Sequence, residues 1–186
     1  MSSIRVGRIK FDRAFVSGWS QRYANTANEQ ELLTMVGPAV ALRGYYTMNE
    51  LAKVGEWKWP RISGRLTQNS AHDVEDITRM ALAATERIQH RALGLLRGVG
   101  DQVATALLTV WAPDRHTILD FPAVDALDAL HRLKGLPETP PQHEAGHLPE
   151  YLAYLEFCRG VSRRVGVGLG DLDRALWQWS KEGMPY

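Results

Sequence analysis

The stretch LRGVGDQVATALLTVWAPDRHTILD, residues 96–120, decides how the rest of the chain is interpreted. Gly98 and Gly100 separate one helical run from the next, and glycine permits a positive φ and a close approach of another backbone. The acid Asp120 ends the stretch, just before a third helical run. We therefore expect a tight turn between two helices, followed by a carboxylate at the start of another helix.

The turn at Arg97, Gly98, Val99 and Gly100 has two interpretations from these residues alone. The first N–H groups of the helix that follows have no partner within that helix, so they form a binding site for an anion such as DNA phosphate. The turn is equally consistent with a simple corner between two packed helices. Both interpretations stay open on the residues of the turn.

Helical periodicity runs through most of the chain and predicts an all-α fold. Apolar residues recur every three or four positions in most segments, whereas alternation typical of strands is weak and short. The segment GLPETPPQHEAGHLP, 135–149, is the one obvious loop, because it is rich in proline and glycine. We expect helices over 11–23, from Asn28 to a break or kink at Gly37-Pro38, from Thr47 with Glu50 completing a capping box, over 73–96, over 101–111, over 122–133, and twice after the loop.

Composition bounds the class of protein. With 186 residues, of which 45% are hydrophobic, the chain can bury a core as a single domain. One cysteine, Cys158, excludes an internal disulfide framework and a zinc or iron–sulfur site built from several cysteines. No apolar run approaches the roughly 20 residues of a membrane helix, and the N-terminus lacks the apolar centre of a signal peptide, so we expect a cytoplasmic protein that does not span a membrane.

Residues 86–133 resemble the helix-hairpin-helix plus Gly/Pro/Asp (HhH-GPD) signature of the endonuclease III and adenine-glycosylase superfamily of DNA glycosylases. The hairpin, Ala104, the apolar run 106–108, the loop APDRHT and then Ile118-Leu119-Asp120 follow in the order of that signature without a gap. The resemblance implies a two-lobed helical fold in one domain over residues 1–186, with the hairpin inside 86–112. It also implies DNA as the partner.

Asp120 matches the catalytic aspartate of that family. The resemblance implies that its carboxylate stabilises the cationic sugar formed when an N-glycosidic bond breaks, or activates the attacking water. The alternative is that Asp120 only caps the helix that begins FPAVDAL, with Pro122 in the first turn. The two roles are compatible.

The sequence also departs from the family pattern. Gln102 stands where members that also cleave the strand carry a lysine, so no amine is present there to form a Schiff base. Arg97 replaces the usual hairpin proline and adds a cation. The four cysteines of cluster-bearing members are absent, so no cofactor is required. The family pattern also implies a monovalent cation held by the backbone carbonyls of Gly94, Leu96 and Val99.

A glycosylase further needs groups that hold the extruded nucleotide. The segment GEWKWPRISGR, 55–65, places Trp57 and Trp59 among Lys58, Arg61 and Arg65. Aromatic rings stack on bases and cations bind phosphates, so this cluster is a candidate DNA-facing surface. The alternative is that the tryptophans belong to the core and the cations to a solvated face.

Three classes of function remain. The first is a monofunctional glycosylase-like hydrolase that removes a damaged or modified base from DNA. The second is a DNA-binding protein that keeps the fold without the reaction, a reading that the net charge of only +1 leaves open. The third is a helical interaction module with no nucleic-acid partner.

Overall fold

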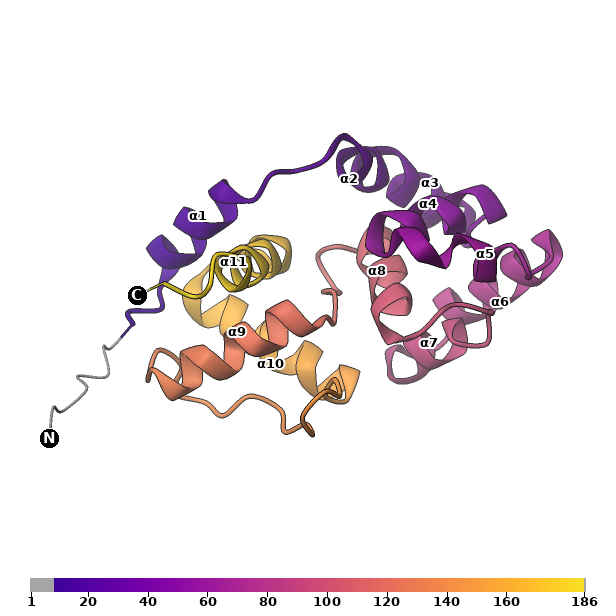
Figure 1. The fold of residues 1–186 in the computed structure, drawn as a ribbon. Coiled ribbons are helices and arrows are strands. Elements are labelled where there is room, and N and C mark those ends of the chain that lie inside the picture. Colours follow the sequence, from indigo (N-terminus) through magenta and orange to yellow (C-terminus); the bar gives the residue numbers. More distant parts are fainter. Residues whose placement is uncertain (1–8, 186) are drawn as a thin grey trace, which may run out of the picture. The chain divides into compact units, whose positions relative to one another are not determined.

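The computed structural model describes residues 9–185, and this part of the chain contains helices and no β-strand. The all-α prediction is thereby confirmed. None of the described helices is long and apolar enough to cross a membrane. The chain divides into two compact units: unit 1 is formed by both ends of the chain, up to Ala24 and from Asp120 onward, and unit 2 is Asn25–Leu119 (Figure 1).

Unit 1 is built around α11, which packs against the three other helices of the unit. The expected apolar stripe of the first helix is present, because Phe15 lies with its ring centroid 5.2 Å from that of Phe11 and 6.2 Å from that of Trp19. Phe15 also meets the buried Trp179 of α11 edge-on at 5.6 Å. The helices are α1 (Arg13–Arg22), α9 (Phe121–Arg132), α10 (Tyr151–Val165) and α11 (Leu169–Lys181).

Unit 2 is built around α8, which is buried along most of its length and packs on several other helices of the unit. The Tyr46 hydroxyl donates a hydrogen bond of 2.6 Å to the Leu107 carbonyl in the middle of α8. The elements are α2 (Ala27–Glu31), the π-helix η1 (Leu32–Val36), α3 (Gly37–Arg43), α4 (Met48–Lys58), the 3₁₀ turn η2 (Pro60–Ile62), α5 (Ser63–Leu66), α6 (Ala71–Ala83), α7 (Glu86–Leu93) and α8 (Asp101–Trp111).

The first helices of unit 2 differ from the prediction. Thr26, not Asn28, caps α2, because its hydroxyl accepts the Glu29 N–H at 3.1 Å. Gly37-Pro38 does not break the helix: the Gly37 N–H donates to the Leu32 carbonyl, and this π turn carries the chain past the proline, which has no N–H of its own. Gly37 is required by packing, since a Cβ there would lie 2.2 Å from the Val110 carbonyl oxygen.

The expected single helix over 73–96 is wrong, because the chain forms α6 and α7 with a break at Ala84. Ala84 is extended, with ψ of 165°. The buried Gln89 amide donates to the carbonyls of Leu82 and Ala84, each at 3.2 Å, and so satisfies groups at the end of α6. Ser70 caps α6 with a capping box that involves Asp73.

The capping box predicted at Thr47 is confirmed at the start of α4.

The loop over 135–149 is tied to unit 1 by a polar contact. Nε2 of His143 lies 2.9 Å from Oδ2 of Asp128 on α9, and this hydrogen bond raises the pKa of the imidazole. Leu136 is buried, so the loop also contributes to the core.

The His143–Asp128 contact predicts a pH-dependent stability. Since the folded pKa of His143 is raised, the contact stabilises fully below the unfolded value of about 6.5 and loses this effect as pH rises through the folded pKa. We expect Asp128→Asn to lower the free energy of unfolding by about 0.5–1 kcal/mol near pH 5.5, with a smaller difference near pH 8.5. Urea denaturation at the two pH values measures this. An equal cost at both would contradict it.

The close approach at Gly37 predicts a second stability effect. Gly37→Ala forces the methyl group against a backbone carbonyl of α8 and should lower the free energy of unfolding by about 1–3 kcal/mol. Gly18→Ala is the matched control: Gly18 lies inside α1 with open space around its Cβ position, so alanine there should stabilise by about 0.5–1 kcal/mol. Thermal and urea denaturation of both variants compare them. A Gly37→Ala protein as stable as the parent would show that α8 can move away.

Candidate nucleic-acid interface

The hairpin joins α7 to α8 within unit 2. Gly98 has a φ of +84°, the left-handed conformation expected at a glycine turn. Gly100 is extended instead, with φ −93° and ψ −177°, so the expectation of a positive φ holds for the first glycine alone. The turn is closed by the Val99 N–H, which donates to the Leu96 carbonyl at 3.1 Å.

The two glycines differ in their surroundings as well. A Cβ on Gly98 would lie 2.9 Å from Cβ of Arg65 and 3.3 Å from Cδ2 of Leu66, so the hairpin backbone packs directly on α5. A Cβ on Gly100 would meet nothing within 4 Å. Close packing inside the protein therefore explains Gly98, whereas Gly100 leaves a bare backbone that an outside group can approach.

Asn69 holds the hairpin in place through its side-chain amide. Its Oδ1 accepts the Arg97 N–H at 2.8 Å, and its Nδ2 donates to the Arg97 carbonyl at 3.0 Å and to the Leu66 carbonyl at 2.9 Å. Asn69 lies in the polar run QNSAHD, residues 68–73. No local pattern points to a partner so far along the chain, so this role is absent from the prediction.

The N-terminus of α8 has no side-chain cap. Ala104 is the first residue whose N–H finds an acceptor in the turn before it, the Gly100 carbonyl at 2.9 Å. The N–H groups of the preceding positions therefore lie at the positive end of the helix dipole without an intrahelical acceptor. Gln102 sits in this first turn, partly exposed. Asp101 also lies there, exposed to solvent, and its negative charge opposes the binding of an anion.

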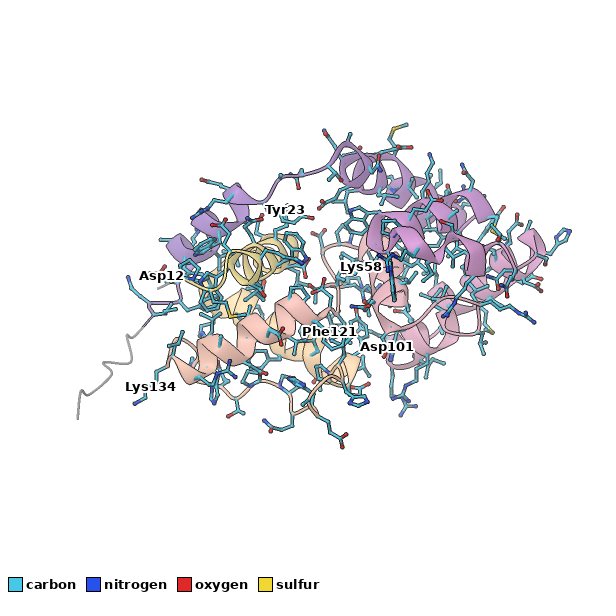
Figure 2. All side chains as sticks on the ribbon, in the orientation of Figure 1. Asp12, Tyr23, Lys58, Asp101, Phe121 and Lys134 are labelled. Carbon is cyan, nitrogen blue, oxygen red and sulfur yellow. The ribbon has the colours of Figure 1, made fainter. Side chains whose placement is uncertain are left out.

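The segment 55–65 forms a surface on the same unit. Trp59, which is 52% exposed, lines a depression of about 180 Å³ together with Arg61, Ile62 and Arg65. Trp57 and Lys58 lie in the last turn of α4, and each is only partly exposed. Figure 2 labels Lys58 at the end of α4 and Asp101 at the start of α8. Because Gly98 packs on Arg65, the depression and the hairpin are adjacent.

Three arginines lie at this surface without a carboxylate partner, a property that they share with arginines elsewhere in the described residues such as Arg87 and Arg132. The side chains of Arg61, Arg65 and Arg97 form no ion pair with any residue in the described part of the chain. Five other arginines have carboxylate partners: Arg22–Glu182, Arg43–Glu50, Arg115–Glu86, Arg164–Glu138 and Arg174–Asp171. The three guanidinium groups are therefore not held in ion pairs, although Asp101 places a negative charge at the same hairpin.

Asp120 belongs to unit 1 and caps α9. Its Oδ1 accepts the Ala123 N–H at 3.2 Å, with Pro122 in the first turn, so the capping role is present. The side chain is 5% exposed. The Asp120 carboxylate also acts on Tyr154 of α10. The pKa of the Tyr154 phenol is raised well above its usual value, mainly by burial and then by the charges of Cys158, Asp173 and Asp120. Asp120 is therefore a largely buried cap.

Thr105 fixes the residue that precedes Asp120. Its Oγ1 accepts the Leu119 N–H at 3.0 Å, and both residues are fully buried in unit 2. Thr105 lies one turn beyond the hairpin end of α8, so this bond holds the end of the loop APDRHT to that helix. A threonine in an apolar helical run is the only sequence signal for this role, and it does not name the partner.

The candidate cation ligands are partly compatible with their expected role. In the described chain, the carbonyls of Gly94 and Val99 accept no hydrogen bond, and the Val99 oxygen lies 3.7 Å from the Cβ position of Gly94. The Leu96 carbonyl already accepts the Val99 N–H and has one lone pair left. The carbonyls of Gly94 and Val99, and one lone pair of the Leu96 carbonyl, are therefore without a hydrogen-bond donor in the described residues.

The opposing charges at the hairpin allow a test of the DNA binding that the sequence resemblance implies. Asp101→Asn removes a negative charge beside the α8 N-terminus and should strengthen duplex binding about two- to fivefold, because a like charge at contact distance costs about 1 kcal/mol in water. Arg97→Ala should weaken binding by a similar factor and reduce the dependence of log affinity on log salt by about one ion. Fluorescence anisotropy at fixed salt measures both.

Asp125→Asn is the matched control for this prediction, because Asp125 is an exposed acid on α9 in unit 1. It makes the same change in net charge and should leave the affinity nearly unaltered. Equal effects of the two substitutions would mean that overall charge, not the hairpin, governs binding.

Comparisons of the chain with protein-family models, with curated proteins and with solved structures returned no match. The resemblance of residues 86–133 to the HhH-GPD signature, together with the hairpin geometry and the unpaired arginines of unit 2, is therefore the basis for a function.

Proposed function

We propose that the protein binds DNA through the hairpin and removes a damaged or modified base by hydrolysis, as a monofunctional DNA glycosylase with a two-lobed HhH-GPD-like fold. The observation that carries the proposal is the uncapped N-terminus of α8 beside a bare Gly100. An uncapped helix end next to open space suits a phosphate group. The chain divides into two helical units, and the sequence of unit 2 lies between the two segments that form unit 1. This division is compatible with a two-lobed fold.

The hairpin surface supports DNA as the partner. Arg61, Arg65 and Arg97 lack carboxylate partners in the described structure, and cations of this kind bind phosphate. The Asn69 amide bonds both the N–H and the carbonyl of Arg97 and so keeps the hairpin backbone in one conformation. The hairpin therefore needs little further ordering when a DNA strand binds. A monovalent cation at the carbonyls of Gly94, Leu96 and Val99 would add positive charge at the same turn.

In this proposal, Asp120 supplies the chemistry. When the glycosidic bond breaks, positive charge develops on the deoxyribose, and an ionised carboxylate in a largely dry environment stabilises that charge. The same carboxylate can accept a proton from the water that attacks the sugar. The carboxylate also caps α9, because its Oδ1 accepts the Ala123 N–H.

Gln102 defines the product. A strand-cleaving glycosylase needs an amine that attacks the sugar, and glutamine supplies none. The reaction therefore ends at an abasic site in an intact strand, which breaks when alkali is added. No covalent enzyme–DNA adduct should be trapped by borohydride.

A second candidate is a DNA-binding protein without catalysis. The burial of Asp120 favours it, because the carboxylate is 5% exposed and already serves as a helix cap. Under this candidate, the hairpin surface binds DNA and Asp120 is purely structural.

A panel of duplexes that carry uracil, alkylated purines or oxidised guanine, followed by alkali, tests the proposal. We expect base release from at least one lesion. Asp120→Asn should reduce its rate by about a hundredfold or more, since a positioned general acid or base contributes roughly 10²–10⁴-fold. Asparagine caps helices about as well as aspartate, so this substitution removes the charge and keeps the fold.

Asp120→Ala serves as the companion variant because it removes both cap and charge. It should lose the activity and also about 0.5–2 kcal/mol of stability. Binding without base release from any lesion, together with an unaltered affinity of Asp120→Asn, would favour the non-catalytic candidate. Base release that persists in Asp120→Asn would assign the chemistry to another residue.

A further inference from the structure

We propose that the depression lined by Trp59, Arg61, Ile62 and Arg65 binds one unpaired nucleobase, which stacks on the Trp59 indole. The proposal rests on the proposed function in taking nucleic acid as the partner. It adds that unit 2 recognises a base that has left the duplex stack, through residues that all belong to unit 2, whereas Asp120 belongs to unit 1.

The aromatic platform is exposed, and the backbone that carries it is held by hydrogen bonds. Trp59 is half exposed, yet its backbone is bonded on both sides: its N–H donates to the Gly55 carbonyl at 2.7 Å, and its carbonyl accepts the Ile62 N–H at 3.0 Å. Pro60 follows directly and fixes its own φ. The backbone at this position therefore needs little ordering when a ring stacks on the indole, which leaves more of the stacking free energy available for binding.

The chemistry of the remaining walls fits a nucleotide. Ile62 adds apolar surface, which suits the face of a base. Arg61 and Arg65 carry positive charge without any carboxylate partner in the described residues, which suits the phosphates on either side. An aromatic ring that shares a depression with two arginines offers single-stranded nucleic acid both a surface for stacking and positive charge for its phosphates.

The position of the depression connects it to the hairpin. Arg65 and Leu66 pack against the backbone at Gly98. The side-chain amide of Asn69 donates to the carbonyls of both Leu66 and Arg97 and so links α5 to the hairpin. A strand whose phosphate binds at the start of α8 therefore passes beside the depression. The faces of paired bases are covered by their neighbours in the duplex, so only a base outside the stack can lie on Trp59.

Anisotropy titrations of the full chain with three short duplexes test the proposal. One duplex is fully paired, one carries a single bulged thymidine, and one carries an abasic tetrahydrofuran residue in the bulge. We expect the bulged base to bind about tenfold tighter than the abasic bulge, since one stacked base contributes a factor of roughly five to a hundred. Trp59→Ala should abolish this difference, and Trp59→Phe should keep part of it.

Arginine variants distinguish the contribution of base stacking to the affinity from the contribution of phosphate contacts. Arg65→Ala should weaken binding of the bulged and the abasic duplex by the same factor, because it contacts phosphate. Arg132→Ala is the matched control, as it removes an exposed cation from the last turn of α9 in unit 1 and should leave both affinities nearly unaltered. Circular dichroism confirms that each variant folds.

The outcomes distinguish this proposal from the proposed function. Equal affinity for the base and the abasic bulge, or a difference that survives in Trp59→Ala, overturns the stacking site even if base release is found. A Trp59-dependent preference without any base release supports the stacking site and counts against the glycosylase. An acidic peptide that binds in a Trp59-dependent manner, with no binding of any duplex, overturns both.

Discussion

The burial of α8 is the constraint on which unit 2 depends. The helix is apolar along most of its length and is covered by other helices of the unit, so its position is fixed by packing over many side chains. A helix fixed in this way holds both of its ends in place. One end begins at the hairpin, and the buried Thr105 holds Leu119 to the helix shortly after its start. The backbone groups at its N-terminus therefore keep one arrangement.

Short-range sequence signals gave most of the helices. The capping box at Thr47, the cap at Asp120 and the apolar stripe of α1 were predictable because each depends on residues three or four positions apart. The errors arose where tertiary contacts override local pattern. The break at Ala84 is stabilised by the Gln89 side chain, and the helix passes Gly37-Pro38 through a π turn. Neither feature has a local signature that separates it from the expected alternative.

The candidate site was predictable to a similar degree. The left-handed turn at Gly98 and the surface position of Trp59 and Arg61 could be predicted from sequence, because glycine turns and interleaved aromatic and basic residues are local patterns; a functional role of these residues stays a prediction. Asn69 and Arg65 were not assigned to the hairpin, since their contacts with it join residues distant in the chain. The different roles of the two glycines also required structure: one is packed on α5, and the other faces open space.

The discontinuous make-up of unit 1 has a consequence for how the polypeptide folds during synthesis. Unit 2 is complete once Leu119 has emerged from the ribosome, but α1 has to wait for α11, whose Trp179 covers Phe15. Domains generally fold as they are made, from the N-terminus onward. Until α11 has been synthesised, the aromatic stripe of α1 has no native partner to cover it. The nascent chain therefore exposes an apolar segment to which chaperones can bind and through which it can aggregate.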